Sequence, residues 1–370
     1  MSEAPSRTLS ELRIVIPNFN WRYSGVTSVN RTIAPLLAKH CQVAWLGMHR
    51  PKEVAPLSLG GLLRLRFGRR DSSAFAIWHA RRNVEMIVGL ALRGLGFRLT
   101  PVFTSEAQRH HTWITRFLIA RMDAVIATSE TAASYLRRQA TIIAHGIDTE
   151  VFRPAAARTG TPDATGLPGT YGIGAFGRVR PQKGTDVFVA AMCRLLPQFP
   201  HFTAFVLGRV TAEHQAFFER LRHMVETAGL GERIQFLGER PVDEVPGWYR
   251  RLTLYAFTSR NEGFGLTLLE AMASGNAVVA ARAGVAETVV ADGETGILVP
   301  AGDVDALVQA LEPLMRDPAR AAEMGRHGRA RAMAEFSLNT EAERIVAFYR
   351  QVRDAASQGN LEASRSGTPR

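Results

Sequence analysis

Short apolar segments alternate with amphipathic ones along most of the chain. The apolar segments are continuous rather than strictly alternating, which is typical of strands that are buried on both faces of a sheet. In the first half they predict strands over 13–17, 42–46, 99–104, 124–128 and 141–144, with helices over 29–40 and 130–139. In the second half they predict strands over 171–176, 203–207, 234–237, 252–258, 277–281 and 296–299, with helices over 186–196, 212–228 and 266–273.

This alternation of strands and helices predicts an α/β protein with two parallel, doubly wound sheets. A chain of 370 residues has the length expected for two domains. Residues 154–170 are rich in Pro, Gly, Ala and Thr and predict a linker. We therefore expect an N-terminal domain over 1–153 and a C-terminal domain over 171–336.

The pattern from 304 to 353 is helical, with breaks near 317–318 and 337. It predicts a C-terminal helix over 337–354 that could cross back to the N-terminal domain. Residues 355–370 are polar and are expected to be disordered.

The composition excludes several classes of protein. At 46% hydrophobic and 21% charged residues, the chain is neither mostly disordered nor a collagen. Its most apolar long stretch, 86–97, falls short of the ~20 residues that a membrane-spanning helix needs. No N-terminal targeting signal is visible, and the only cysteines are Cys41 and Cys193. A disulfide framework is not expected, and a reducing cytoplasm fits.

The positive charge is concentrated in the first half of the chain. Residues 1–150 contain 20 Lys and Arg against 10 Asp and Glu, whereas residues 151–370 contain 25 against 24. Leucines and arginines alternate around 57–67, a pattern that suits an anionic lipid interface. We expect an anionic partner for this half, either a membrane surface or an acidic acceptor. No nucleic-acid module accompanies the charge, so nucleic acid is not expected, and a solvated basic surface is the alternative.

Two cations lie in the loop that follows the predicted strand 171–176. The loop reads GRVRPQKG over 177–184 and matches neither a Walker loop nor a dinucleotide fingerprint. Arg178 offers a planar fork of donors and Lys183 offers a point charge, a combination that suits a diphosphate. The N-terminus of the following helix adds about half a positive charge. An ordinary surface loop is the alternative.

Two acids lie in and beyond the loop that follows the predicted strand 252–258. Gly263 and Gly265 allow close backbone approach, and the free N–H groups of the helix that begins near Leu266 can receive phosphate oxygens. Glu262 can accept hydrogen bonds from sugar hydroxyls, and Glu270 can accept both hydroxyls of a ribose. Alternatively, Glu270 is an acid that the helix dipole favours.

A third loop, over 18–28, follows the first predicted strand and contains Gly25. The missing side chain of Gly25 would let a phosphate or sugar approach the backbone.

Together these loops resemble those of glycosyltransferase family 4, whose members have the GT-B fold of two Rossmann-like domains facing a cleft. The resemblance rests on EGFGLTLLEAMASG at 262–275, GRVRPQKG at 177–184, AHGID at 144–148 and ADGETG at 291–296. It implies that Arg178 and Lys183 bind the diphosphate of a nucleotide sugar, that Glu262 contacts the donor sugar and that Glu270 contacts the ribose. The implied donor-binding set is Gly25, Arg178, Lys183, Glu262, Phe264, Gly265, Leu266, Thr267 and Glu270, with Arg178, Lys183 and Glu262 as its catalytic members.

Three positions depart from the usual family pattern. Ser24 stands where many members have glycine, and His145 stands where asparagine is more usual. Ser105 and Glu106 stand where many members have a histidine after the strand. Three nearby side chains are candidates for the acceptor or sugar side of the site: Glu106, His110 and His111.

A narrower resemblance links 16–36 and 103–113 to the lipopolysaccharide core mannosyltransferases of Gram-negative bacteria. It implies transfer of mannose from GDP-mannose to the acidic sugar Kdo on lipid A, at the inner face of the cytoplasmic membrane. The family retains anomeric configuration and needs no metal or other cofactor, and no DxD-type acidic pair occupies a suitable loop. No nucleophile is evident, which favours front-face attack with the leaving phosphate as base.

Other functions fit parts of the pattern. A UDP- or ADP-sugar could be the donor, with another glycan or lipid as acceptor. A GT-B sugar-nucleotide epimerase would share the fold but needs no acceptor surface. A basic membrane-binding or nucleic-acid-binding protein would use only the first half of the chain.

Overall fold

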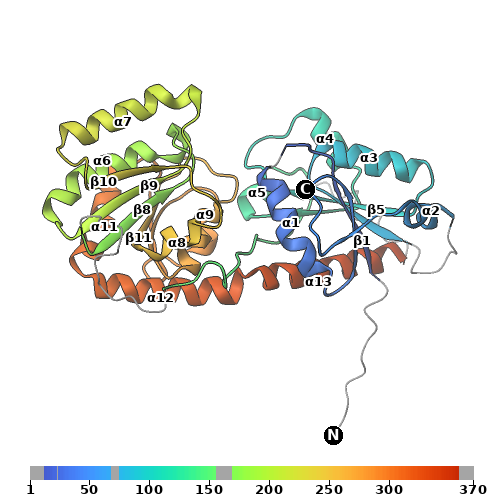
Figure 1. Ribbon diagram of the computed structural model, residues 1–370. Coiled ribbons are helices and arrows are strands. Elements are labelled where there is room, and N and C mark those ends of the chain that lie inside the picture. The colour runs from blue at the N-terminus through green and yellow to red at the C-terminus, as the bar shows by residue number, and fades with distance from the viewer. Residues whose placement is uncertain (1–11, 23, 68–74, 156–168, 358–370) are drawn as a thin grey trace, which may run out of the picture. The chain divides into compact units, whose positions relative to one another are not determined.

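The computed structural model describes residues 12–22, 24–67, 75–155 and 169–357. These residues form two compact units, which are described separately (Figure 1). The first unit holds the described residues up to Ala144 together with those from Leu338 onward. The second unit holds His145–Ser337.

The first unit is built on a seven-stranded parallel sheet of order β3-β2-β1-β4-β5-β6-β7. At the centre, Val15 of β1 lies opposite Ala44 of β2 on one side and Trp78 of β4 on the other. The strands are β1 (Arg13–Asn18), β2 (Gln42–Gly47), β3 (Ala55–Pro56), β4 (Ala76–Ala80), β5 (Leu99–Ser105), β6 (Ala124–Ala127) and β7 (Thr141–Ile142).

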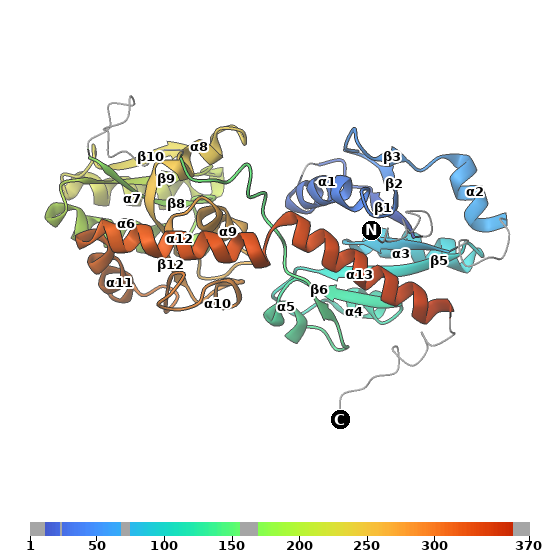
Figure 2. The ribbon, with the colours of Figure 1, turned by 90° about the horizontal axis from the view of Figure 1, so that it is seen from below.

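Helices cover both faces of this sheet. On one face, Leu37 of α1 and Tyr349 of α13 share a core with Ile14 of β1. On the other face, Met86 of α3 packs against Trp78. Figure 2 shows α13 running along the first unit beside α1. The helices are α1 (Gly25–Leu37), α2 (Leu59–Phe67), α3 (Asn83–Gly94), α4 (Trp113–Ile119), α5 (Glu130–Ser134) and α13 (Leu338–Ser357).

The second unit is built on a six-stranded parallel sheet of order β10-β9-β8-β11-β12-β13. One face is covered by α6, α7 and α11, whose apolar side chains share a single core with Ile173 of β8 and Leu254 of β11. The strands are β8 (Tyr171–Phe176), β9 (Phe202–Leu207), β10 (Ile234–Gly238), β11 (Leu252–Phe257), β12 (Ala277–Ala281) and β13 (Ile297–Val299). The helices are α6 (Thr185–Leu195), α7 (Gln215–Thr227), α8 (Val245–Arg250), α9 (Leu266–Ala273), α10 (Ala286–Val289), α11 (Val304–Arg316) and α12 (Pro318–Glu335), with short 3-10 turns η2 (Pro181–Lys183), η3 (Leu196–Gln198) and η4 (Ala212–His214).

The prediction of two parallel, doubly wound sheets is confirmed. All six strands expected in the second half are present within a residue or two of their predicted ends. In the first half the prediction missed β4, which is five residues long and fully buried. It also missed the short β3, and α1 begins at Gly25 rather than at residue 29.

The prediction placed the first domain boundary after residue 153, and the structure places it after Ala144. Residues 145–153 are bonded to the second unit because Ile147 N–H donates to the Phe336 carbonyl at 2.8 Å. Arg329 of α12 donates to the Phe152 carbonyl at 3.2 Å. The helix predicted over 337–354 is α13, and it packs in the first unit. Most of the predicted linker, 156–168, and the tail from 358 lie outside the described residues.

Candidate active site

Two loops of the second unit bring the predicted charged residues together. The Lys183 loop (residues 177–184) follows β8, and the Glu262 loop (residues 258–265) follows β11. The two strands are paired in parallel, so both loops leave the carboxyl edge of the sheet. Ligands of doubly wound sheets bind at this edge.

The backbones of the two loops are in direct contact at Gly184. Gly184 has φ 65°, and a Cβ built there would lie 1.9 Å from the carbonyl oxygen of Thr258. The Thr258 hydroxyl donates to the Lys183 carbonyl at 3.0 Å. Only glycine combines this left-handed backbone with so close an approach.

Arg260 also joins the two loops. Its guanidinium donates to both carboxylate oxygens of Asp186 at 2.7 and 2.8 Å, and its backbone N–H donates to the Gln182 carbonyl at 2.8 Å. A bidentate arginine–carboxylate pair has a specific geometry, so it restricts how the loops can move. Neither Arg260 nor Asp186 was among the predicted site residues.

Lys183 and Glu262 form an ion pair across the two loops. Both side chains are mostly buried, with 17% and 16% exposed. The second carboxylate oxygen of Glu262 accepts from the backbone N–H of Gly263 at 3.2 Å. Arg178 is exposed and forms no ion pair with any residue that the structure describes. The structure thus holds Lys183 against an acid and leaves Arg178 open to solvent.

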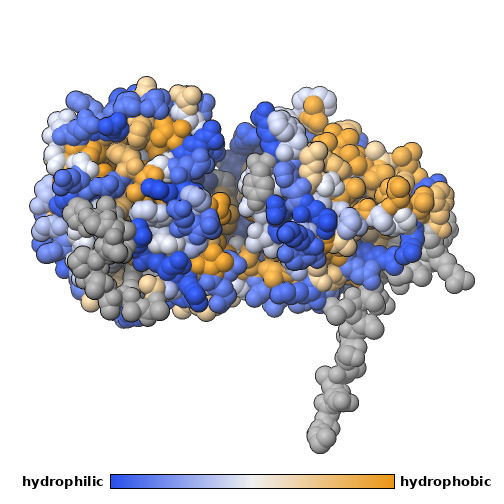
Figure 3. Space-filling model, viewed as in Figure 1, coloured by the Kyte–Doolittle hydropathy of each residue, from blue (hydrophilic) through white to orange (hydrophobic). Residues whose placement is uncertain are grey.

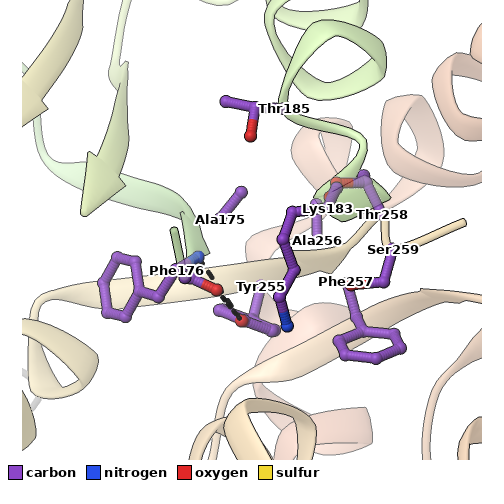
Figure 4. Close-up of a pocket in the computed structure, with 10 residues that line it drawn as sticks. Ala175, Phe176, Lys183, Thr185, Tyr255, Ala256, Phe257, Thr258 and Ser259 are labelled. Carbon is purple, nitrogen blue, oxygen red and sulfur yellow. Dashed lines mark hydrogen bonds between the residues drawn. The ribbon is translucent and has the colours of Figure 1, made fainter. Parts of the chain in front are cut away.

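A small pocket lies at the ends of the two strands beneath these loops (Figure 4). Its walls include Phe176 from β8, Tyr255 from β11 and the side of Lys183. The Tyr255 hydroxyl donates to the Phe176 carbonyl at 3.3 Å, which bonds the two strands at the pocket floor.

The start of α9 depends on Gly265. Gly265 has φ 107°, and a Cβ there would lie 2.9 Å from the Phe257 ring and 3.4 Å from Glu262 Cγ. The next residues, Leu266 and Thr267, are half-buried and form the first turn of α9. The first N–H groups of a helix have no partner within the helix, so this turn can donate to a ligand.

The Phe264 side chain is buried against His145, with ring centres 4.9 Å apart. Its carbonyl accepts from Val285 N–H at 2.9 Å. In this structure Phe264 is therefore a packing residue of the Glu262 loop, and its predicted role in donor binding stays a prediction.

Glu270 lies on the second turn of α9 and accepts a hydrogen bond from the Tyr249 hydroxyl at 2.8 Å. Burial raises the pKa of Glu270 to about 7, while the Tyr249 hydrogen bond and the charge of Lys183 oppose the rise. Burial and the nearby Glu270 carboxylate raise the pKa of Tyr249. The carboxyl group can therefore change its charge near neutral pH.

Replacing Glu270 with glutamine is expected to reduce the pH dependence of stability between about pH 4.5 and 7. The folded protein favours the protonated acid, so wild-type stabilisation from this group is full below the unfolded pKa and is lost as pH rises through 7. The difference between the proteins should be on the order of 2–3 kcal/mol at the high end of this range. Urea unfolding of both proteins at a series of pH values measures it. The exposed Glu294→Gln serves as control, and parallel pH curves for wild type and Glu270→Gln would contradict the expectation.

The remaining predicted residues lie in the first unit. Gly25 is exposed at the start of α1, and a Cβ there would meet nothing within 4 Å. Glu106 follows β5 and pairs with the buried Arg81 at 2.8 Å. His111 lies 3.3 Å from the Ser105 hydroxyl, and burial lowers the pKa of its ring. His110 is exposed and packs edge-on against Tyr135.

A polar network at the carboxyl edge of the first sheet was not predicted from the sequence. Arg82, after β4, donates to Asn18 Oδ1 at 2.7 Å, to Ser24 Oγ at 2.8 Å and to Thr27 Oγ1 at 3.0 Å. It also pairs with the buried Glu85. These bonds link the end of β1 to the N-terminal turn of α1. The feature of the sequence that could have indicated this network is the pair of arginines directly after a short apolar segment.

Two properties of the described residues bear on metal ions and membranes. Within the described residues, no three His, Cys, Asp or Glu side chains gather in a way that could hold a metal ion. None of the described helices has both the length and the apolarity to cross a bilayer.

Comparison with known proteins identifies the family. Residues 167–331 match the family described as Glycosyl transferases group 1. The chain is 49% identical to the lipopolysaccharide core biosynthesis mannosyltransferase LpcC of Rhizobium leguminosarum bv. viciae, over 92% of this chain and 97% of the relative. It is 44% identical to the lipopolysaccharide core biosynthesis mannosyltransferase LpsB of Rhizobium meliloti, over 92% and 98%. The chain belongs to the group 1 glycosyltransferases and is an enzyme of that class.

A solved structure of HepE from Anabaena, in complex with UDP and glucose, has the same fold. Its TM-score is 0.74 at 21% identity, over 92% of this chain and all of that one. The two parallel-sheet units therefore have the GT-B fold, as the sequence predicted.

Proposed function

We propose that this enzyme transfers mannose from GDP-mannose to an acidic, lipid-linked acceptor in lipopolysaccharide core synthesis, with Kdo on lipid A as the acceptor. The names of the two rhizobial relatives support the sugar and the pathway. The observation that carries the chemistry is the Lys183–Glu262 pair at the carboxyl edge of the second sheet, beside the start of α9.

The proposed reaction develops negative charge on the departing diphosphate. Lys183 and the exposed Arg178 lie on one loop, where they can stabilise that charge together with the N–H groups of Leu266 and Thr267. Oriented donors that are in place before the reaction stabilise a leaving group without reorganisation. The transfer is proposed to retain anomeric configuration and to need no metal ion.

Glu262 has two roles in this proposal. In this structure it pairs with the Lys183 ammonium group. A bound diphosphate offers Lys183 a more highly charged partner, which frees the Glu262 carboxylate to accept hydrogen bonds from the donor sugar. Binding of the diphosphate and orientation of the sugar are then coupled through one ion pair. Glu270, bonded to Tyr249, is proposed to accept from the ribose hydroxyls.

The first unit is proposed to receive the acceptor. The excess of cations in residues 1–150 suits an acidic sugar and an anionic membrane surface. Because the proposed acceptor is anchored in lipid, we also propose peripheral attachment at the inner face of the cytoplasmic membrane.

A panel of nucleotide sugars tests the donor. GDP-mannose at about 100 times its dissociation constant should add about 2.7 kcal/mol to the free energy of unfolding, seen as a rise in melting temperature. UDP-glucose and ADP-glucose at the same concentration should give smaller shifts. Stabilisation by a UDP- or ADP-sugar alone would refute GDP-mannose and leave the class of enzyme intact.

A transfer assay tests the acceptor. Radiolabelled GDP-mannose should yield a labelled glycolipid with a Kdo-containing lipid A precursor and none with lipid A that lacks Kdo. Interconversion of free sugar nucleotides without an acceptor would instead indicate an epimerase.

A further inference from the structure

Three helices of the first unit present a large apolar surface to solvent. Of the seventeen large apolar side chains that are exposed among the described residues, nine lie on α2, on α3 with its C-terminal cap, or on α4. Figure 3 shows this surface as the orange area over these helices. We call it the apolar face, and it comprises Leu59, Leu63, Phe67, Val84, Ile87, Leu95, Trp113, Ile114 and Phe117.

The apolar residues form continuous stripes on the outward sides of the helices. On α3 the exposed positions Val84, Ile87 and Ala91 lie three and four residues apart, and Leu95 continues the stripe. On α2 the exposed stripe is Leu59, Leu63 and Phe67. A surface helix of a soluble protein normally has polar residues on this side.

The helices are joined into one surface. The Asn83 side chain donates to Thr115 Oγ1 at 2.9 Å, which links α3 to α4. Arg98 N–H donates to the Leu65 carbonyl at 2.9 Å, which links the segment after α3 to α2. An exposed apolar patch of this kind marks an interaction site.

The charges around the apolar face are positive. The helices α2 and α4 contain Arg64, Arg66 and Arg116 and no acid. The one acid of α3, Glu85, is fully buried and pairs with Arg82. A second copy of the chain would bring these cations against one another, which disfavours self-association.

We propose that the apolar face inserts into the headgroup region of an anionic lipid bilayer. Aromatic residues such as Trp113 favour that interface, and arginines beside an apolar stripe reach anionic headgroups. The guanidinium of Arg121 lies over the Phe117 ring, 3.3 Å from its centre, so a cation and an exposed apolar group are in direct contact on this face. The inference deepens the proposed function and rests on it only for the lipid-linked acceptor.

Vesicle flotation tests the proposal. The full chain is mixed with vesicles of phosphatidylcholine, with or without phosphatidylglycerol, and should float with the anionic vesicles. The double variant Ile87→Gln/Trp113→Gln should bind them about tenfold more weakly, equivalent to about 1.4 kcal/mol. The control Val242→Gln/Met333→Gln removes two exposed apolar side chains from the second unit and should bind as wild type. An unchanged melting temperature confirms that each variant is folded.

Two outcomes would overturn the proposal. The apolar face would be excluded as a bilayer contact if wild type stayed at the bottom of the gradient, apart from the vesicles. It would also be excluded if the Ile87→Gln/Trp113→Gln variant floated as well as wild type. A sedimentation mass of twice 40.6 kDa that the same variant abolishes would assign the face to a second copy.

The donor panel separates this result from the proposed function. Stabilisation by GDP-mannose should be equal in wild type and in the Ile87→Gln/Trp113→Gln variant, because the substitutions lie in the first unit, outside the two loops. Vesicle binding without any GDP-mannose stabilisation would remove the proposed donor and leave the lipid contact standing. Stabilisation by GDP-mannose without vesicle binding would remove the lipid contact and leave the proposed donor standing.

Discussion

Replacing Lys183 with alanine is expected to lower kcat/KM for sugar transfer by about 10²–10³, the effect of losing one oriented charge-stabilising donor. Lys183 is mostly buried and its ammonium group is paired with Glu262, so the charge is held in place at the two loops. Steady-state transfer rates with varied donor measure the effect. If the charge acts mainly on the leaving group, kcat should fall more than KM rises.

The control for this experiment is Arg194→Ala. Arg194 also pairs with an acid across the second unit, but that pair with Asp305 is largely exposed. Exposed ion pairs contribute little to stability, so Arg194→Ala should transfer sugar at the wild-type rate. Near-wild-type transfer by Lys183→Ala would contradict the proposed diphosphate contact.

The double variant Lys183→Ala/Glu262→Gln tests whether the ion pair couples binding of the diphosphate to orientation of the sugar. Lys183→Ala leaves the Glu262 carboxylate without its cation. Because the two residues act on one another, their effects on kcat/KM should not be additive. Additive effects would show that the ion pair does not couple diphosphate and sugar.

Replacing Gly184 with alanine is expected to destabilise the second unit by about 4 kcal/mol, a value that only a few kinds of substitution reach. The left-handed backbone of Gly184 costs about 1–2 kcal/mol for a residue with a Cβ. The larger part comes from the Thr258 carbonyl oxygen, 1.9 Å from the new atom, because the two loops must separate to make room. Urea unfolding measures the loss.

The matched control is Gly231→Ala, since Gly231 is exposed and a Cβ there would meet nothing within 4 Å. It should change stability by less than about 1 kcal/mol. A loss below about 1 kcal/mol in Gly184→Ala would mean that the loops can move apart freely. The close approach at Gly184 would then not be what holds Lys183 near Glu262.

Much of the fold could be predicted because most strands of the two sheets are continuous apolar segments. In the second unit every strand is followed within three residues by Gly, Pro or Ser, so its end is visible in the sequence. The strand β4 was missed because His79 interrupts its apolar segment and Arg81 and Arg82 follow it directly. Its neighbours β1 and β5 pair with it on either side, which supplies hydrogen bonds that no local pattern reveals.

Strand, glycine and charge patterns are local, so they suffice to predict the class of fold and the two loops that carry Arg178, Lys183 and Glu262. The ion pair between Lys183 and Glu262 is evident only in the folded chain, since the two residues lie 79 positions apart and meet through the pairing of β8 with β11. The same holds for the bond from Tyr249 to Glu270, the place of residues 145–153 in the second unit, and the apolar outward sides of α2, α3 and α4. These features could not be predicted because burial and long-range hydrogen bonds depend on which elements pack together.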